Sequence, residues 1–522
     1  MIKILLAIIC FIAATPVVSA PSEVSYYSVS ISLQEDTLRR VIDIRGIQGS
    51  DRLLSRITRG FNPETQSVLL ERAVFGVSEG ETGPIPEWAV DTLSCNDGWQ
   101  LALVTAFPAL REGMTIDYRI AVTDWSGNWE NGAWAVLSPS VKGISPDTCH
   151  FSVSGDMVEK LNWQGRGYEI SRRGETIEFT ATDSSGILVI SPFSTYGELS
   201  IFVMREAIVT LDSPYPPDLR EAALQATSAG ADQHAQTERA RSLLCNSFNP
   251  CSAVQGRDVS AVQDLQEILD QRRGTALEMA LVFAAMCREL GIEADIIPAS
   301  GIDYGIPVPA GWNRFLVKLE SDYGEEWFME PSAFLTSASF IYRPDTLYII
   351  ENGNLRTMPP NEPRENRSSE EWHIDCADGT FSLKMECSGW YDIMLRRMLA
   401  GLSSEEMLLT LSEWSWLSGR TIIPDSLTVS DPFDLGANMT LSVYGKLWIP
   451  IDASLAAEYL PLFDWSKPEN VTDETIRTWA LLRTMDVHSS FPLIMEILND
   501  TVILTDTSGI NNPLPIIFKV TE

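Results

Sequence analysis

Residues 272–294 read R-R-G-T-A-L-E-M-A-L-V-F-A-A-M-C-R-E-L-G-I-E-A, and this stretch decides the fold of the middle of the chain. Between Thr275 and Leu290 its apolar residues cover most faces of a helix, which predicts a helix buried in a core. Thr275 and Glu278 form the T-x-x-E pattern of a capping box, so we expect the helix to begin there. After Gly291 the sequence enters a strand-like run at residues 292–298.

The pattern on the C-terminal side of this helix is that of strands. Strand-like runs follow at residues 314–320 and 326–329, and helical periodicity already begins at Pro217, ahead of the buried helix. Helices followed by strands indicate an α+β domain, which we place at residues 208–357.

The flanking regions are predicted to be mostly β. Short alternating runs broken by Gly, Asn, Asp and Pro fill the region from Val24 to about Val203 and predict a β-rich, sandwich-like domain at residues 21–207. A polar, proline-containing linker is expected at residues 358–370. Residues 371–522 are expected to form a third, mostly β domain, with helical segments at residues 394–417 and 473–483. The fold class is therefore α+β and multidomain.

The N-terminus has the features of a secretory signal. Lys3 precedes an apolar run that ends at Thr15-Pro16, and small residues lie before Pro21, so residues 1–20 are predicted to be a cleaved signal peptide. No later stretch is long and apolar enough to span a bilayer. We therefore expect an exported protein, periplasmic or extracellular. A formal net charge of −33 disfavours nucleic acid and anionic lipid as main partners.

Three segments taken in order resemble the transglutaminase-like core, a papain-like fold. They are residues 272–294, the run G-W-N-R-F-L-V-K-L at 311–319 and the run E-W-F-M-E-P-S-A at 326–333. The flanks resemble the β-rich domain of unknown function and the C-terminal β domain of many bacterial exported proteins with such a core. The resemblance implies a nucleophile at the start of the helix, with a His and an Asp on the two strands.

The residues at those three positions are Thr275, Arg314 and Glu330. A threonine hydroxyl ionises far less readily than a thiol, and a guanidinium cannot accept a proton. We therefore expect a degenerate triad without catalysis, in which Thr275 caps the helix and Arg314 pairs with Glu330. Cys287, further along the same helix, is predicted to be a buried packing residue.

Other residues are assigned more loosely. Residues expected to line a binding cleft in such a core are Tyr304, Trp312, Asn313 and Trp327, although core packing is an open alternative for the aromatic ones. Of the eight cysteines, Cys10 lies in the signal peptide. An oxidising compartment permits disulfides, and position along the chain suggests three pairings: Cys95 with Cys149, Cys245 with Cys251, and Cys376 with Cys387. No regular metal-ligand spacing is present, so neither a metal nor another cofactor is expected.

Three functions stay open on these residues. The first is a non-catalytic module that binds a peptide or an envelope protein. The second is a divergent amide-bond enzyme, a peptidase or acyl transferase, with Thr275 as nucleophile and Glu330 as base. The third is a structural envelope protein that spaces other components apart.

Overall fold

The computed structural model of the chain describes residues 21–447, 482–489 and 516–521, apart from short internal segments. The segments left out are residues 35–36, 52, 62, 64, 77–81, 85–89, 96–99, 107–111, 126–132, 157, 228–230, 252–261, 338–339, 344, 362–364, 376–377 and 418–421. The signal peptide predicted at residues 1–20 and most of the helix predicted at residues 473–483 lie outside the described residues. At the end of the latter segment, Leu482 and Arg483 begin a strand rather than continuing a helix.

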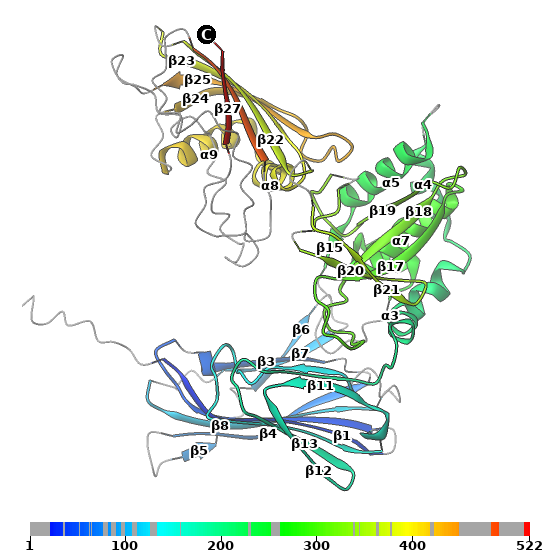
Figure 1. Cartoon of the computed structure of the whole chain (residues 1–522), viewed down its shortest axis with the longest axis vertical. Helices are drawn as coiled ribbons and strands as arrows, with labels where there is room; N and C mark the ends of the chain where they lie inside the picture. The colour runs from blue at the N-terminus through cyan, green and yellow to red at the C-terminus, as the bar shows by residue number, and fades with distance from the viewer. Residues whose placement is uncertain are drawn as a thin grey trace, which may run out of the picture. The chain divides into compact units, whose positions relative to one another are not determined.

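The described chain is multidomain and rich in β-structure, with helices concentrated in its middle, as an α+β protein should be (Figure 1). It divides into two compact units. The first comprises residues 1–199, 253–261 and 304–310, and the second comprises the remainder. The predicted central and C-terminal domains therefore fall together in the second unit.

An eight-stranded sheet forms the larger layer of the first unit. Its order is β12-β13-β10-β1-β2-β8-β4-β5, and its strands are antiparallel except for the parallel pair β1 and β10. The strands are β1 (Glu23–Gln34), β2 (Thr37–Ile47), β4 (Gln66–Gly76), β5 (Thr82–Pro84), β8 (Thr115–Asp124), β10 (Thr148–Gly155), β12 (Tyr168–Arg173) and β13 (Thr176–Ala181). Alternating burial along β8 and β10 reflects one face turned to the core.

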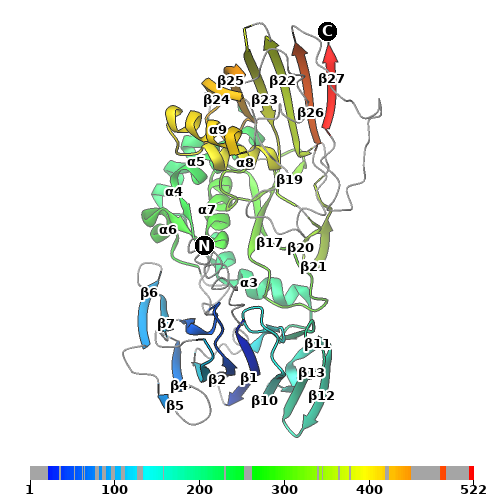
Figure 2. The same ribbon diagram turned by 90° about the vertical axis from the view of Figure 1, so that its left-hand side faces the viewer.

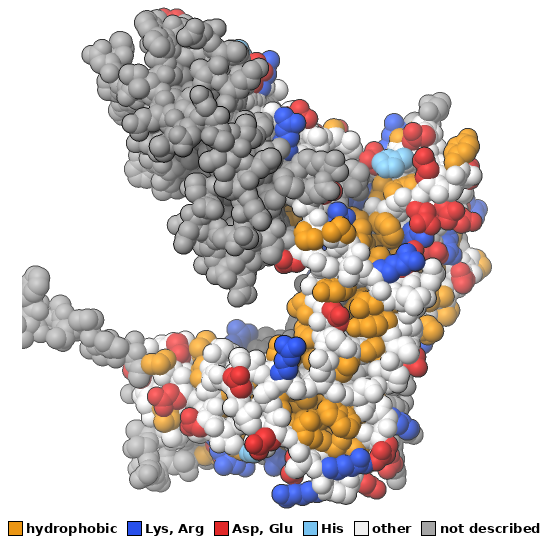
Figure 3. Space-filling view, in the orientation of Figure 1, with side chains coloured by type: hydrophobic (Ala, Val, Ile, Leu, Met, Phe, Trp, Pro, Cys, Tyr) orange, Lys and Arg blue, Asp and Glu red, His pale blue; other side chains and the backbone are white. Residues whose placement is uncertain are grey.

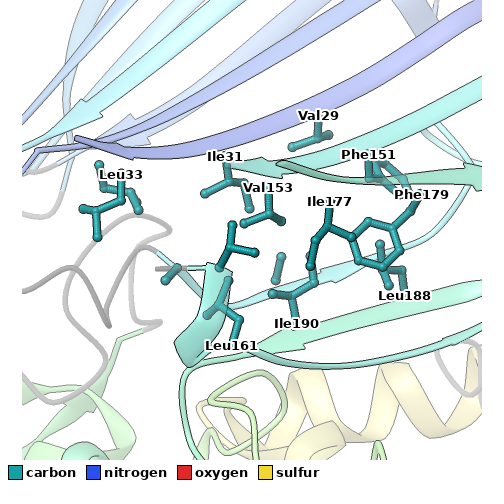
Figure 4. Close-up of a cluster of buried hydrophobic side chains, with 14 of the residues drawn as sticks. Val29, Ile31, Leu33, Phe151, Val153, Leu161, Ile177, Phe179, Leu188 and Ile190 are labelled. Carbon is teal, nitrogen blue, oxygen red and sulfur yellow. The ribbon is translucent and has the colours of Figure 1, made fainter. Parts of the chain in front are cut away.

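Two three-stranded sheets complete this unit. One has the order β11-β14-β9, with β9 (Ala135–Leu137), β11 (Asn162–Arg166) and β14 (Ile187–Ser191). The other has the order β3-β7-β6, with β3 (Arg56–Phe61), β6 (Val90–Cys95) and β7 (Gln100–Ala106). Phe151 and Phe179 of the large sheet lie in one buried cluster with Leu188 and Ile190 of β14 (Figure 4). The large sheet and the sheet of β14 therefore share one core, as the predicted sandwich requires.

The middle of the chain forms the helical part of the second unit. Its helices are α3 (Tyr196–Leu211), α4 (Pro217–Ala226), α5 (Gln233–Ser247), α6 (Leu265–Gln271) and α7 (Ala276–Glu289). The α3 helix corrects the predicted β-rich region up to residue 207. Its apolar residues Leu199, Phe202, Val203 and Ala207 are buried at helical spacing, so period 3.6, not period 2, governs this segment.

An antiparallel sheet of order β19-β18-β17-β20-β21 accompanies these helices. Its strands are β17 (Glu293–Ser300), β18 (Arg314–Glu320), β19 (Glu326–Met329), β20 (Leu347–Glu351) and β21 (Asn354–Met358). The buried α7 packs against β17 and β18. The short strands β15 (Asn249–Pro250) and β16 (Arg273–Gly274) pair in parallel, and β16 directly precedes α7 in the chain.

The C-terminal part contains a six-stranded sheet of order β24-β25-β23-β22-β26-β27, whose strands run side by side in Figure 2. The strands are β22 (Arg367–Asp375), β23 (Thr380–Cys387), β24 (Ile422–Val429), β25 (Met439–Leu447), β26 (Leu482–Ser489) and β27 (Ile516–Thr521). The predicted linker is shorter than expected, because β22 already begins at Arg367. The helical segment predicted at residues 394–417 is two helices, α8 (Trp390–Leu399) and α9 (Ser404–Leu417).

Surface charge is mixed despite the large net charge. On the face shown in Figure 3, acidic and basic side chains are interspersed, and hydrophobic side chains gather in several patches between them. Among the described residues, no helix has the length and apolar character needed to cross a membrane.

Candidate functional site

The N-terminus of α7 is closed by the predicted capping box. The backbone N–H of Glu278 donates to Oγ1 of Thr275 at 3.3 Å, and the backbone N–H of Thr275 donates to Oε2 of Glu278 at 2.7 Å. The second carboxylate oxygen of Glu278 accepts from the backbone N–H of Gln263 at 2.9 Å. The hydroxyl of Thr275 is therefore engaged in ending the helix, which is the structural role its sequence pattern predicts.

Arg314 and Glu330 form the predicted charged pair. Nε of Arg314 donates to Oε1 of Glu330 at 2.7 Å and Nη2 donates to Oε2 at 2.5 Å, so the contact is bidentate. Nη2 also donates to the backbone carbonyl of Tyr342 at 2.9 Å. The two side chains are 22% and 7% exposed. Both carboxylate oxygens of Glu330 are thus occupied by the same guanidinium.

The helix α5 holds the segment that follows β19. Fully buried Arg241 donates to the backbone carbonyls of Glu330, Ala333 and Thr336 at 3.0, 2.8 and 2.7 Å. Sγ of Cys245, one turn further on, lies 3.4 Å from the carbonyl oxygen of Pro331. The position of Glu330 therefore depends on α5 as well as on β19.

His234, at the start of α5, is a residue whose placement sequence reasoning missed. Its ring centroid lies 5.5 Å from that of Trp327 on β19, and Nδ1 lies 3.7 Å from Oε1 of Glu238. Burial raises the pKa of Glu238. Residues 234, 238, 241 and 245 recur at intervals of three and four, and this helical stripe was the available signal.

The four residues expected to line a cleft have different environments. Trp312 is 5% exposed, which leaves little of its ring for a ligand, and Trp327 is half-buried with its indole nitrogen closed off from solvent. Asn313 is exposed. Tyr304 belongs to the first unit, whereas the other three belong to the second. Within this group, the best-defined contact is that between the rings of Trp327 and His234.

Cys287 cannot serve as a nucleophile at the N-terminus of α7, whereas the half-buried Cys251 lies beside Gly274, where its backbone N–H donates to the Gly274 carbonyl at 2.8 Å. Cys287 lies twelve residues beyond Thr275, about 18 Å along the helix axis at 1.5 Å per residue, and is fully buried. Burial raises the pKa of its thiol strongly, so it stays protonated and unreactive. This confirms the predicted packing role of Cys287.

Two of the three disulfide predictions are wrong, and the third involves a cysteine outside the described residues. Cys149 and Cys245 are free thiols, so neither Cys95–Cys149 nor Cys245–Cys251 is formed. Sγ of Cys387 lies 4.0 Å from Oγ of Ser368, and its predicted partner Cys376 lies outside the described residues. Proximity along the chain was the basis of all three pairings, but a disulfide depends on the direction of both Cβ atoms. The sulfur of Cys245, for example, faces the carbonyl group of Pro331.

This arrangement limits the chemistry available at Thr275, Arg314 and Glu330. Proton transfer from the Thr275 hydroxyl would need an acceptor, but Arg314 is a permanent donor and both oxygens of Glu330 accept from it. Within the described residues, no group of three or more His, Cys, Asp or Glu side chains could hold a metal ion.

Comparison with known proteins gives a likeness in fold only. No protein-family model and no curated protein sequence matches the chain. Among solved structures, the chain is similar to a candidate protease from Parabacteroides distasonis, with a TM-score of 0.55 and 14% identity over 82% of this chain and 94% of that one. An M1 zinc metallopeptidase from Deinococcus radiodurans matches 32% of this chain and 42% of its own length, with 14% identity and a TM-score of 0.18. Yeast LTA4 hydrolase with bestatin matches 33% of this chain and 29% of its own length, with 9% identity and a TM-score of 0.19. The last two scores are too low to indicate a shared fold.

Proposed function

We propose that residues 208–357 form a transglutaminase-like core that has lost its chemistry. In this proposal the exported chain binds a peptide or an envelope protein in place of processing it. The proposal rests on the identities and contacts of three residues, Thr275, Arg314 and Glu330.

The observation that carries the proposal is the bidentate pair of Arg314 and Glu330. In a working triad of this kind an imidazole takes a proton from the nucleophile, and a carboxylate orients the imidazole. A guanidinium keeps its charge at any usable pH, so it cannot take that proton. The same two strands are instead joined by a partly buried ion pair.

The order of elements supports the assignment to this fold. A capped, buried helix is followed by two antiparallel strands that carry Arg314 at the start of one and Glu330 just after the end of the other. This is the order in which the resemblance places the nucleophile, the His and the Asp. The assignment predicts that the three positions lie within reach of one another.

Restoring the lost groups tests that assignment. In Thr275→Cys combined with Arg314→His, an imidazole next to the new thiol should favour the thiolate, so alkylation by iodoacetamide near neutral pH should be roughly tenfold faster than in Thr275→Cys alone. The matched control is Cys287, which should stay unmodified in both variants. Equal alkylation rates in the two variants would mean that positions 275 and 314 do not meet.

A divergent amide-bond enzyme is the second candidate, and the likeness in fold to the candidate protease favours considering it. It would use Thr275 as nucleophile and Glu330 as base. Both groups are already engaged, Thr275 with the backbone N–H of Glu278 and Glu330 with Arg314. Incubation of the mature chain with peptide amides and amine acceptors distinguishes the two candidates, because turnover that disappears in Thr275→Ala would overturn the non-catalytic proposal.

Binding itself is tested by a thermal-shift screen of the mature chain with cell-wall peptides and envelope proteins. A ligand that binds only the folded state raises the melting temperature by mass action. The purely structural alternative, in which the chain spaces envelope components apart, predicts no shift with any of them. Mass spectrometry of the mature N-terminus tests export, with cleavage expected after Ala20.

A further inference from the structure

The eight-stranded sheet has one face turned to the core and one face turned outward. Val29, Ile31 and Phe151 point into the buried cluster of the first unit (Figure 4). Successive side chains of a strand point to opposite faces of the sheet, so the residues that alternate with these lie on the outer face. Some outer residues of β1, β2, β4 and β8 are joined by ion pairs and ring contacts. We call them the outer-face network, and they are Tyr26, Arg39, Asp43, Arg45, Glu71, Arg72, Asp117 and Arg119.

Arg72 of β4 lies at the centre of this network. Its Nη2 donates to Oδ1 of Asp43 on β2 at 3.0 Å and to Oδ1 of Asp117 on β8 at 2.7 Å. Its Nε donates to the same oxygen of Asp117 at 3.1 Å. Nε of Arg45 lies 3.6 Å from the other oxygen of Asp117. One guanidinium therefore joins three strands and holds both carboxylates in place.

A second set of ion pairs lies on the same face. Glu71 pairs with Arg39, and its Oε2 lies 3.3 Å from Nε of Arg119. Across the network the arginine side chains are 36–50% exposed, whereas the carboxylate side chains are 13–36% exposed. The guanidiniums are thus the more exposed partners, yet hydrogen-bond donors and acceptors both reach solvent.

Tyr26 of β1 adds an aromatic ring whose position is fixed by its neighbours. Cζ of Arg45 lies 5.0 Å from the centroid of the Tyr26 ring, and the ring of His150 on β10 lies 6.1 Å away, centroid to centroid. His150 is itself positioned by Thr180 on β13, since its Nδ1 lies 3.1 Å from Oγ1 of that residue. The Tyr26 side chain is half-buried, so part of the ring still faces solvent.

The outer face continues toward β10 with small hydroxyl side chains. Ser28 and Ser30 lie on this face of β1, and Oγ of Ser152 on β10 donates to Oγ of Ser30 at 3.0 Å. Serine side chains are much shorter than arginine side chains, so β1 and β10 form a shallow floor beside the arginines of β2. The 12 residues of β1 extend over about 40 Å at roughly 3.3 Å per residue. A surface this long and open fits an extended chain, because small molecules prefer concave pockets.

We propose that the outer face of the eight-stranded sheet binds a neutral polysaccharide. A sugar hydroxyl both donates and accepts hydrogen bonds, so it matches a surface on which guanidinium donors and carboxylate acceptors are interleaved. An anionic ligand only accepts, and the carboxylates of Asp43 and Asp117 would repel it. The apolar C–H face of a sugar ring can lie against the exposed part of the Tyr26 ring.

Two further properties of the chain favour a neutral polysaccharide. Side chains that ion pairs already hold in place lose little conformational entropy when they bind a ligand. The net charge of −33 repels polyanions but does not repel an uncharged chain. The surface belongs to the first unit, whereas Thr275, Arg314 and Glu330 belong to the second, so this inference goes beyond the function proposed for the core and does not depend on it.

The test measures binding of soluble neutral polysaccharides to the full mature chain by affinity electrophoresis and calorimetry. The probes are dextran, laminarin, galactomannan and arabinoxylan, with alginate and polyglutamate as polyanions. At least one neutral probe should bind saturably. Its Kd should change less than about twofold between roughly 50 and 500 mM NaCl, because salt screens interactions between charges and leaves hydrogen bonds to an uncharged ligand largely unaffected.

Substitutions connect the binding to the outer-face network. Arg72→Met should weaken it roughly tenfold, because it removes charged donors and releases both carboxylates. Tyr26→Ala should also weaken it roughly tenfold, whereas Tyr26→Phe, which keeps the ring, should bind within about twofold of the wild type. Arg220→Met is the matched control, since it removes an arginine from an exposed bidentate pair of the second unit and should bind like the wild type.

Three results would overturn the proposal. The first is that none of the four neutral polysaccharides binds saturably. The second is that Tyr26→Ala binds as tightly as Tyr26→Phe, a comparison that stays valid even if Arg72→Met lowers the melting temperature. The third is that alginate or polyglutamate binds more tightly than every neutral probe and is released by salt, which would show that the arginines recognise charge.

Discussion

Removing one member of the Arg314–Glu330 pair should destabilise the central sheet far more than removing both. Glu330→Leu leaves a guanidinium that is only 22% exposed with the Tyr342 carbonyl as its remaining described acceptor. Loss of one partner of a buried pair costs roughly 3–5 kcal/mol, and the partial exposure of Arg314 places the expected loss near the lower end, at about 3 kcal/mol.

Arg314→Met should cost a similar amount, because it leaves the 7% exposed carboxylate of Glu330 without its two donors. In the double variant both charges are gone, and replacement of a buried pair by apolar residues is often close to neutral. The double-mutant cycle should therefore give a coupling free energy of more than about 2 kcal/mol.

Urea unfolding with hydrogen exchange read on β18 and β19 is the suitable assay, because a chain with two units need not unfold in one step. Arg220 and Glu289 provide the matched control, since they form a bidentate pair at 2.9 and 3.4 Å in which Arg220 is 64% exposed. That cycle should show coupling within experimental error. Additive losses at Arg314 and Glu330 would refute the account of a buried, mutually dependent pair.

Three further predictions concern single residues. Thr275→Ala should lower the free energy of unfolding by about 1 kcal/mol through loss of the cap, while Thr275→Ser should retain it, as measured by urea unfolding. Cys287 should resist alkylation in the native chain and react only on unfolding, because burial raises the pKa of its thiol; rapid native labelling would contradict its buried position. Hydrogen bonding from Lys318 lowers the pKa of Glu351 in the folded chain. The stabilisation that the Glu351 carboxylate provides is therefore complete above about pH 4.5 and is lost as the pH falls through the lower pKa of the folded state. Melting temperatures measured from pH 6 to 3 should fall less steeply in Glu351→Gln than in the wild type.

Local chemistry explains which parts of the fold were predictable. The capping box at Thr275 and Glu278 depends on residues three positions apart, and β18 and β19 have the predicted bounds. The α3 helix was missed where its first turns were assigned to the β-rich region, because short apolar runs do not by themselves distinguish a strand from a buried helix. The pairings Cys95–Cys149 and Cys245–Cys251 failed because distance along the chain does not give the direction of a side chain.

The sequence by itself determined the capped central helix, the apolar setting of Cys287 and the absence of a proton acceptor at position 314, since each follows from residue type and close spacing. Only the tertiary structure decided that Arg241 holds the segment after Glu330 and that the His234 ring lies against Trp327. These groups come from elements far apart in the chain. Their meeting depends on sheet register and on helix packing, which no local pattern encodes.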